Sequence, residues 1–194
     1  MIATQNETLA RMLADFKLEE DLMGKGLTQL AEADHRYVKD MRINLTNALS
    51  YPNLNKKESY LLALAVAVNE KNTPLIDSFT KLAETEMVTQ EELNEVYACV
   101  SLMNVNNVFY RFRHFTKKDY YQQTPAGIKM SIMLNPVLGK EFFELLSLAI
   151  SAVNGCEMCV NAHEQSVIQH GATEARIYDA IRLVSIVKGF SNLF

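Results

Sequence analysis

Glycine and proline are scarce in this chain of 194 residues, which has only seven glycines and four prolines. This composition disfavours both a disordered chain and a turn-rich β fold. A strong excess of either charge is also missing, because the formal net charge is −4 and acidic and basic residues are mixed along the sequence. Without a basic stripe or a basic amphipathic segment, we expect neither nucleic acid nor a membrane surface as a partner.

Long apolar runs are missing as well. The two longest, residues 61–68 and 145–153, are far shorter than the roughly 20 residues that span a bilayer. The first residues lack the basic and apolar regions of a secretory signal. Three cysteines, an odd number, do not make a secreted disulfide framework. We therefore expect a protein of the reducing cytoplasm, where a CxxC motif is more often redox-active or metal-binding than structural.

Helical periodicity dominates what is present. Apolar residues make up 48% of the chain, enough for a sizeable core, and they recur at helical spacing. Thr73 before Pro74 predicts a helix start, and Thr89 with Glu92 predicts a capping box. The pattern predicts an all-α fold, with an irregular segment at residues 113–138 and helices over residues 7–22, 26–48, 57–69, 73–86, 90–110, 139–153, 156–170 and 173–190.

An internal repeat divides most of the chain into two similar halves. Residues 62–65 (LALA) match residues 146–149 (LSLA), and Thr89 and Ser101 match Thr173 and Ser185 at the same separation. A single three-helix unit could not bury its whole apolar face, so the two units are expected to share one core. We predict one domain over residues 1–194, in which a helical extension at residues 1–25 precedes two degenerate repeats at about 26–112 and 126–194.

The repeat is degenerate at one informative place. Aligned at a separation of 85, the first half has a lysine, a proline and a serine where the second half has two cysteines and a histidine; the six residues are Lys71, Pro74, Ser78, Cys156, Cys159 and His163. The first half therefore keeps the scaffold without the chemistry. This contrast argues against the cysteines being needed merely to build the fold.

Those second-half residues lie in one short run, residues 154–163 (NGCEMCVNAH). Cys156, Cys159 and His163 are spaced at i, i+3 and i+7, so on a helix they share one stripe. Thiol–disulfide chemistry needs a nucleophile, a resolving partner and a base within reach of one another. The spacing is therefore typical of a redox site.

Asn154 and Gly155 precede this helix and predict its start, with Asn154 as the N-cap and Cys156 in the first turn. Free N–H groups and the helix dipole favour a thiolate there. A helix terminus contributes only about 0.3–1 kcal/mol, which is too little to ionise a thiol fully at neutral pH. A base is needed, and His163 is the nearest candidate.

Glu144 is a second candidate, because it lies inside the apolar stretch of the preceding helix. A buried carboxylate must be paired or protonated. If the two helices form a hairpin, Glu144 can hydrogen-bond His163, orient the imidazole and raise its basicity.

Other interpretations of the same residues stay open. The two cysteines could be small buried side chains, or ligands of a zinc ion together with His163. The three residues span about 10 Å of helix axis and lack an obvious fourth ligand, which makes a tetrahedral site awkward. We expect no bound metal, haem or flavin, and no glycine-rich phosphate loop indicates a nucleotide. Surface or hydrogen-bonded core roles are expected for His35, His114 and His170, and a small buried apolar role for Cys99.

Beyond the CxxC motif, five segments together resemble the signatures of the alkyl hydroperoxidase AhpD family, within the carboxymuconolactone decarboxylase-like superfamily. They occur in that family's order and near its spacing, and the similarity runs from about Leu27 to the end. The segments are residues 106–111 (NNVFYR), 127–130 (GIKM), 143–145 (FEL), 151–156 (SAVNGC) and 162–164 (AHE).

The resemblance implies a helical fold of two repeated halves, homo-oligomers (commonly trimers, or dimers of trimers), weak peroxidase activity and a thiol–disulfide role. It implies that Cys159 meets a hydroperoxide, that Cys156 closes a disulfide with it, and that Glu144 and His163 form a proton relay. It further implies an external dithiol reductant, the dihydrolipoyl group of a dehydrogenase-complex acyltransferase, and a peroxiredoxin of the AhpC type as partner.

Met158 departs from the family pattern, which has histidine between the two cysteines. A methionine carries no proton, so the relay lacks one imidazole and peroxidase turnover is expected to be weaker. Disulfide exchange does not need that residue. Two other functions stay open: a redox-sensing or disulfide-exchange adaptor without turnover, and carboxymuconolactone decarboxylase-like action on a small lactone acid, although that branch does not depend on the CxxC motif.

Overall fold

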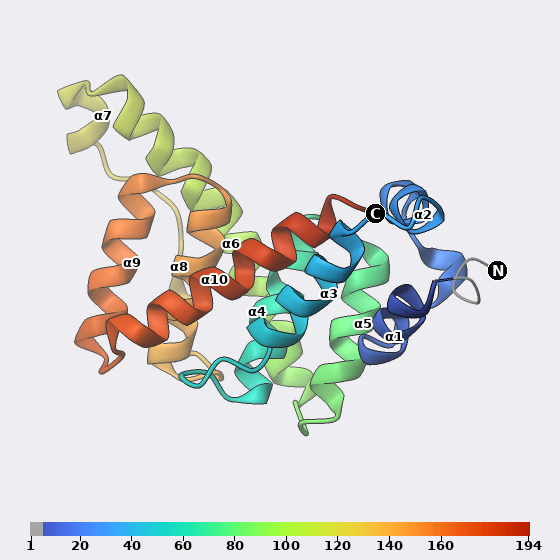
Figure 1. Ribbon diagram of the computed structural model, residues 1–194. Helices are drawn as coiled ribbons and strands as arrows, with labels where there is room; N and C mark the ends of the chain where they lie inside the picture. The colour runs from blue at the N-terminus through green and yellow to red at the C-terminus, as the bar shows by residue number, and fades with distance from the viewer. Residues whose placement is uncertain (1–5) are drawn as a thin grey trace.

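The computed structural model describes residues 6–194, and all regular structure in that range is helical (Figure 1). Residues 1–5, the start of the predicted extension, lie outside the described residues. No helix among residues 6–194 is both long enough and apolar enough to cross a bilayer. The elements are α1 (Glu7–Asp15), η1 (Glu20–Leu22), α2 (Lys25–Glu32), α3 (Tyr37–Ala48), α4 (Lys56–Asn69), α5 (Thr73–Glu84), α6 (Gln90–Thr116), α7 (Asp119–Gln123), η2 (Ser131–Met133), α8 (Lys140–Val153), α9 (Glu157–Gln169) and α10 (Glu174–Ser191).

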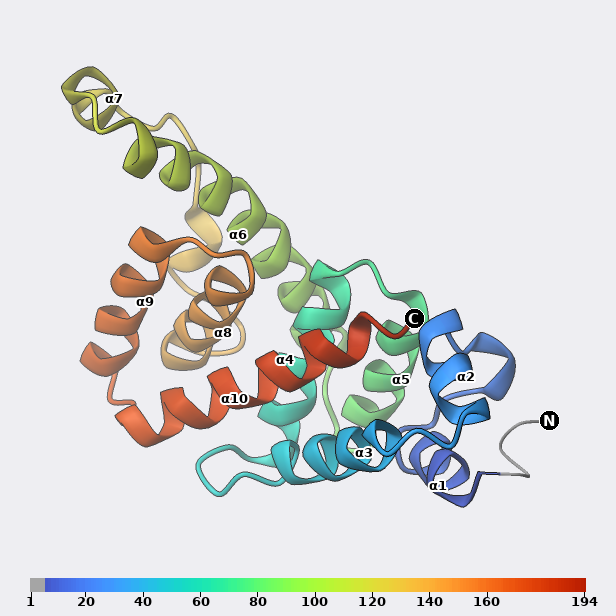
Figure 2. The same ribbon diagram turned by 45° about the horizontal axis from the view of Figure 1, so that its top comes forward.

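Two helices, α4 and α8, lie at the centre of the core. Every residue from Leu61 to Ala67 of α4 and from Phe142 to Ser151 of α8 is buried. A helix that is apolar on nearly all sides must be covered on all sides. The two helices contact each other, α6 and α10 contact both, α5 covers α4 and α9 covers α8. Figures 1 and 2 show α10 running across this centre towards α3.

The central helices belong to two three-helix units with the same spacing. Helices α8, α9 and α10 each begin 84 residues after α4, α5 and α6, respectively. The turn after the first helix of each unit has a residue with positive φ at the same place, Lys71 at 56° and Gly155 at 69°. This constant separation supports the internal repeat, while the residue bounds of the two halves stay a prediction.

The same spacing corrects the alignment of the candidate site. At a separation of 84 rather than 85, the positions of Cys156, Cys159 and His163 correspond to Asn72, Leu75 and Phe79. The predicted counterparts Lys71, Pro74 and Ser78 were each one residue off, because short helical matches in sequence leave the turn length free. Leu75 and Phe79 are fully buried, so the first unit fills this place with apolar side chains.

Each unit ties its first helix to its third with an ion pair at equivalent positions, but the charges are reversed. In the first unit Lys57 Nζ lies 2.6 Å from Glu92 Oε1, and in the second Arg176 Nε lies 2.8 Å from Glu141 Oε1. Arg176 also reaches across to the first unit, where it lies 2.7 Å from Glu58 Oε1. The guanidinium therefore links both units at one point.

Each unit also supplies a hydrogen-bond acceptor to a loop of the other unit. Glu95 of α6 accepts hydrogen bonds from the backbone amides of Val137 and Leu138, just before α8. At the equivalent position of α10, Asp179 accepts bonds from the backbone and side-chain nitrogens of Asn53, just before α4. Each third helix thus holds the entry to the other unit's first helix.

Three predicted helix bounds were wrong. The helices over residues 7–22 and 26–48 are each interrupted, at Lys17 (φ 51°) and Asp34 (φ 45°), where left-handed backbone turns the chain. Neither position carries the glycine that usually announces such a turn. The helix predicted to end at Tyr110 continues to Thr116, because no glycine or proline interrupts it before the left-handed Lys117.

The Arg176 ion pairs predict a stability effect. Arg176→Met should lower the free energy of unfolding by about 2 kcal/mol, since it leaves two partly buried carboxylates, of Glu58 and Glu141, without their cation. Urea unfolding followed by circular dichroism measures it. Arg11→Met is the matched control, because its pair with Glu7 is exposed and should contribute less than about 0.5 kcal/mol. Equal effects of the two changes would contradict the prediction.

Candidate active site

The turn between α8 and α9 brings the two cysteines together. Helix α8 ends at its C-cap Asn154, Gly155 adopts a φ of 69°, and Cys156 is the N-cap of α9. Cys156 and Cys159 form a disulfide, with their Cα atoms 5.3 Å apart. The expectation that Asn154 caps α9 and that Cys156 lies in its first turn was therefore wrong; Cys159 occupies that turn, next to the positive end of the helix dipole.

Both cysteines are shielded within the monomer. Cys156 is fully buried and Cys159 is 5% exposed. Of the two, Cys159 is therefore the one that a small molecule or a thiol from outside reaches first.

Glu144 and His163 meet as the sequence predicted. Glu144, on the first turns of α8, is almost fully buried, and its Oε2 lies 2.7 Å from Nδ1 of His163 on α9. Its other carboxylate oxygen, Oε1, lies 2.8 Å from Nζ of Lys140, one helical turn earlier. The sequence analysis missed Lys140, although its spacing of i and i+4 from Glu144 is the usual signal for an ion pair on a helix.

The two cationic neighbours fix the charge of Glu144. Burial alone would raise the pKa of this carboxyl group, but hydrogen bonds from His163 and Lys140 outweigh it and lower the pKa to about 2. An ionised carboxylate can only accept hydrogen bonds. Nδ1 of His163 therefore carries the proton that bonds Glu144, and Nε2 is the ring nitrogen that this contact does not use.

A network of asparagines supports the turn that carries the cysteines. Asn154 accepts a hydrogen bond from Asn69 at 3.0 Å and donates one to Asn107 at 2.9 Å, and Asn107 in turn donates one to Ser151 at 2.9 Å. Arg111 donates a bond to the backbone carbonyl of Asn154 at 2.6 Å. Helices α4 and α6 thus hold the end of α8, which fixes where α9 and its cysteines begin.

The first unit has unreactive side chains at the equivalent positions. The positions of Lys140 and Glu144 correspond to Lys56 and Tyr60, and the Lys56 ammonium lies 5.9 Å from the centre of the Tyr60 ring. A cation over an aromatic face has replaced a cation beside a carboxylate. Together with Leu75 and Phe79, this leaves the first unit without acid, base or thiol at the equivalent place.

The remaining candidates play other parts. Cys99 is buried as predicted, and burial raises the pKa of its thiol to about 12. His35 accepts a hydrogen bond from the backbone of Tyr37, and His170 is bonded to the backbone carbonyl of Ser166. His114 Nε2 lies 3.4 Å from Glu157, the residue that follows Cys156. Among residues 6–194, no three histidine, cysteine, aspartate or glutamate side chains are grouped to hold a metal ion.

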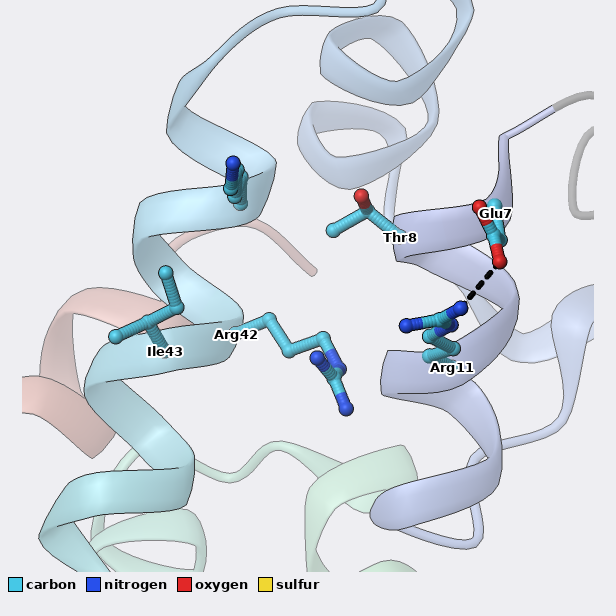
Figure 3. A pocket seen from close by; sticks show the side chains of 6 residues that line it. Glu7, Thr8, Arg11, Arg42 and Ile43 are labelled. Atoms are coloured by element: carbon cyan, nitrogen blue, oxygen red, sulfur yellow. Dashed lines mark hydrogen bonds and ion pairs between the residues drawn. The ribbon is translucent and has the colours of Figure 1, made fainter.

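One pocket elsewhere shares no residue with this site. It has a volume of about 270 Å³ between α1 and α3, and Figure 3 shows the side chains that face it. Of its cations, Arg11 is paired with Glu7 and Arg42 with Asp15. The lining residues are Glu7, Thr8, Arg11, Lys39, Arg42 and Ile43.

The sequence of this chain is similar to one family model and to several named proteins. The model of the carboxymuconolactone decarboxylase family matches residues 120–194. A protein of Coxiella burnetii called alkyl hydroperoxide reductase AhpD is 38% identical over 160 residues, 81% of this chain and 90% of that protein. Proteins of the same name from Anaeromyxobacter dehalogenans and Rhizorhabdus wittichii are each 35% identical, over 83% and 86% of this chain and 86% and 96% of their own lengths.

A solved structure shares the fold. The crystal structure of a putative gamma-carboxymuconolactone decarboxylase subunit from Burkholderia xenovorans superposes with a TM-score of 0.67, over 100% of this chain and 95% of that one. The sequence identity is 15%, so the likeness concerns the helical fold alone.

The paired carboxylate predicts a pH dependence of stability. Because the folded state holds the pKa of Glu144 at about 2, below the ordinary value of 4.5, ionised Glu144 stabilises the fold above pH 4.5. This contribution is lost as the pH falls from 4.5 towards 2. Urea unfolding of the native chain and of Glu144→Gln at several pH values should show a stability difference that shrinks over this range.

Lys140→Met gives a sharper version of the same test. Removing the ammonium should raise the pKa of Glu144, and carboxyl carbon NMR of the folded protein measures that pKa directly. Lys140→Arg keeps the cation and is the control. A Glu144 titration unchanged by Lys140→Met would show that the ion pair does not hold the carboxylate charged.

Proposed function

The chain belongs to the AhpD family, and from this premise we propose that it reduces alkyl hydroperoxides through its Cys156–Cys159 pair. One observation carries the proposal: a disulfide at the start of α9 and, on the same helix, a histidine whose Nδ1 lies 2.7 Å from a buried carboxylate. A reversible sulfur pair with an oriented base is what thiol peroxidase chemistry needs.

The oxidative half-reaction begins with the reduced pair. Nε2 of His163 takes the proton of the Cys159 thiol, and the thiolate attacks the O–O bond of the hydroperoxide. The S–O bond forms as the O–O bond breaks, Cys159 becomes a sulfenic acid, and the alkoxide leaving group takes the proton back as alcohol. The Cys156 thiol then attacks the sulfenic sulfur, which yields the disulfide and releases water.

Glu144 and Lys140 support this proton transfer without contacting the substrate. The Glu144 carboxylate holds the imidazole ring by Nδ1, keeps Nε2 as the working nitrogen and stabilises the imidazolium that forms. Lys140 occupies the other carboxylate oxygen. This relay works without an imidazole at Met158, so the missing family histidine is expected to slow turnover rather than abolish it.

The reductive half-reaction needs an external dithiol. A thiolate of the dithiol attacks the disulfide and forms a mixed disulfide, and the second thiol displaces the protein sulfur. Two electrons pass from the dithiol to the pair, which returns to two thiols. We propose the dihydrolipoyl group of an acyltransferase as this reductant, an AhpC-type peroxiredoxin as a partner, and a cytoplasmic homo-oligomer, trimeric or a dimer of trimers, as the working form.

Two competing functions each have an observation in their favour. The burial of both cysteines suits a redox-sensing adaptor that exchanges its disulfide rarely, since a slow switch does not need exposed sulfur. The matched family model is named for a decarboxylase, which suits action on a small lactone acid. Turnover of peroxide with a dithiol reductant would exclude the adaptor without turnover. Lactone decarboxylation that survives alkylation of the thiols would support the decarboxylase instead of the peroxidase.

The proposed chemistry predicts a graded set of variants. Cys156→Ser and Cys159→Ser should each abolish steady-state reduction of cumene hydroperoxide by dihydrolipoamide, because neither can close the disulfide. His163→Gln and Glu144→Gln should lower kcat by about 10²-fold, the usual contribution of a positioned base. Cys99→Ala is the control and should retain full activity. Unchanged turnover in either active-pair serine variant would overturn the proposal.

A further inference from the structure

Helix α6 has an exposed face without charge. Its 27 residues carry no acidic or basic side chain from Val96 to Tyr110, although one side of this stretch is open to solvent. Surface helices of globular proteins normally place charged residues on the solvent side. Figures 1 and 2 show the C-terminal part of α6 projecting, with α7, beyond the rest of the molecule.

The exposed residues on this face follow a regular spacing. Tyr97, Ser101, Asn104, Val108, Phe112 and Phe115 recur every three or four residues, with Val105 beside them. Val105 is 49% exposed, Val108 61% and Phe115 70%. Steps of three and four are the pattern by which one helix packs along another. Five of the seven side chains are apolar or aromatic, with Ser101 and Asn104 between them, and an exposed stripe of this composition is typical of an interaction site.

A groove runs beside the stripe. It has a volume of about 730 Å³, and α6 forms one wall with Tyr97, Ser101 and Val108. The other wall includes Val68, at the end of α4, and Lys71 in the turn that follows it. Side chains from a helix laid along α6 would enter this groove.

We propose that the stripe binds a second copy of α6, antiparallel and related by a two-fold axis near Asn104 and Val105. The charges at the two ends of the helix favour this partner. The N-terminal end is acidic at Glu91, and the C-terminal end is basic through Arg113 in the last turn and Lys118 just beyond the helix. Antiparallel packing places each acidic end against the basic end of the other copy, whereas parallel packing would place like charges together.

The two-fold axis fixes the register. Tyr97 lies opposite Phe112 of the second copy, Ser101 opposite Val108, and Val105 next to itself across the axis. Such an isologous contact closes after two copies. It rests on the surface of α6 alone and does not depend on peroxide chemistry at the disulfide.

Cysteine cross-linking tests the register. Val105→Cys should form a covalent dimer of the 22.0 kDa chain under mild oxidation, because its sulfur meets its own copy at the axis. Phe115→Cys should not, since antiparallel helices place its two copies about 30 Å apart. Tyr178→Cys, on the exposed side of α10, is the control for random collision. Cross-linking of Phe115→Cys as efficient as that of Val105→Cys would overturn the antiparallel arrangement.

The mass in solution tests the contact itself. Val108→Glu should halve the mass measured by light scattering, because pairing would bring two new carboxylates, one from each copy, to within about one helical turn of the axis. Tyr178→Glu should leave the mass unchanged. Glu91→Lys and Lys118→Glu should each weaken the assembly several-fold and restore it together. A native chain that is monomeric, or a Val108→Glu chain of unchanged mass, would overturn the proposal; equal melting temperatures establish that the variants are folded.

Discussion

The buried carboxylate of Glu144 constrains the site more than any other group. A charge so far from water is tolerated only beside partners, and here a lysine on its own helix and a histidine on the next one supply them. Because the histidine comes from α9, the same contact holds α8 and α9 in register at the level of the cysteines. Satisfying one buried charge therefore determines both the packing of the hairpin and the tautomer of its imidazole.

The two three-helix units show which parts of this arrangement the fold itself requires. Both keep the spacing of the three helix starts, a left-handed residue in the first turn and an ion pair between first and third helices. Only the second has an acid, a base and two sulfurs, and the first has Tyr60, Asn72, Leu75 and Phe79 in their places. The first unit keeps the scaffold without this acid, base and thiol pair, so the reactive set is an addition to the scaffold and not a condition for it.

Much of this could be predicted from the sequence, and the failures have common causes. Helical periodicity gave the all-α fold, and the isolated acid in an apolar run gave the contact between Glu144 and His163. The breaks at Lys17 and Asp34 could not be foreseen, because ordinary residues adopt the left-handed backbone there. Lys140 was overlooked although its spacing was visible, and the one-residue error in the repeat arose because turn length leaves little trace in sequence.

The reciprocal contacts of Glu95 and Asp179 have a consequence for how the chain reaches its native state. Each carboxylate satisfies backbone amides that belong to the opposite unit. A half that formed alone would leave its own entry loop without these acceptors and its own carboxylate without these donors. The two halves are therefore obliged to acquire structure together, and the energy landscape favours a single cooperative transition over a stable half-folded intermediate.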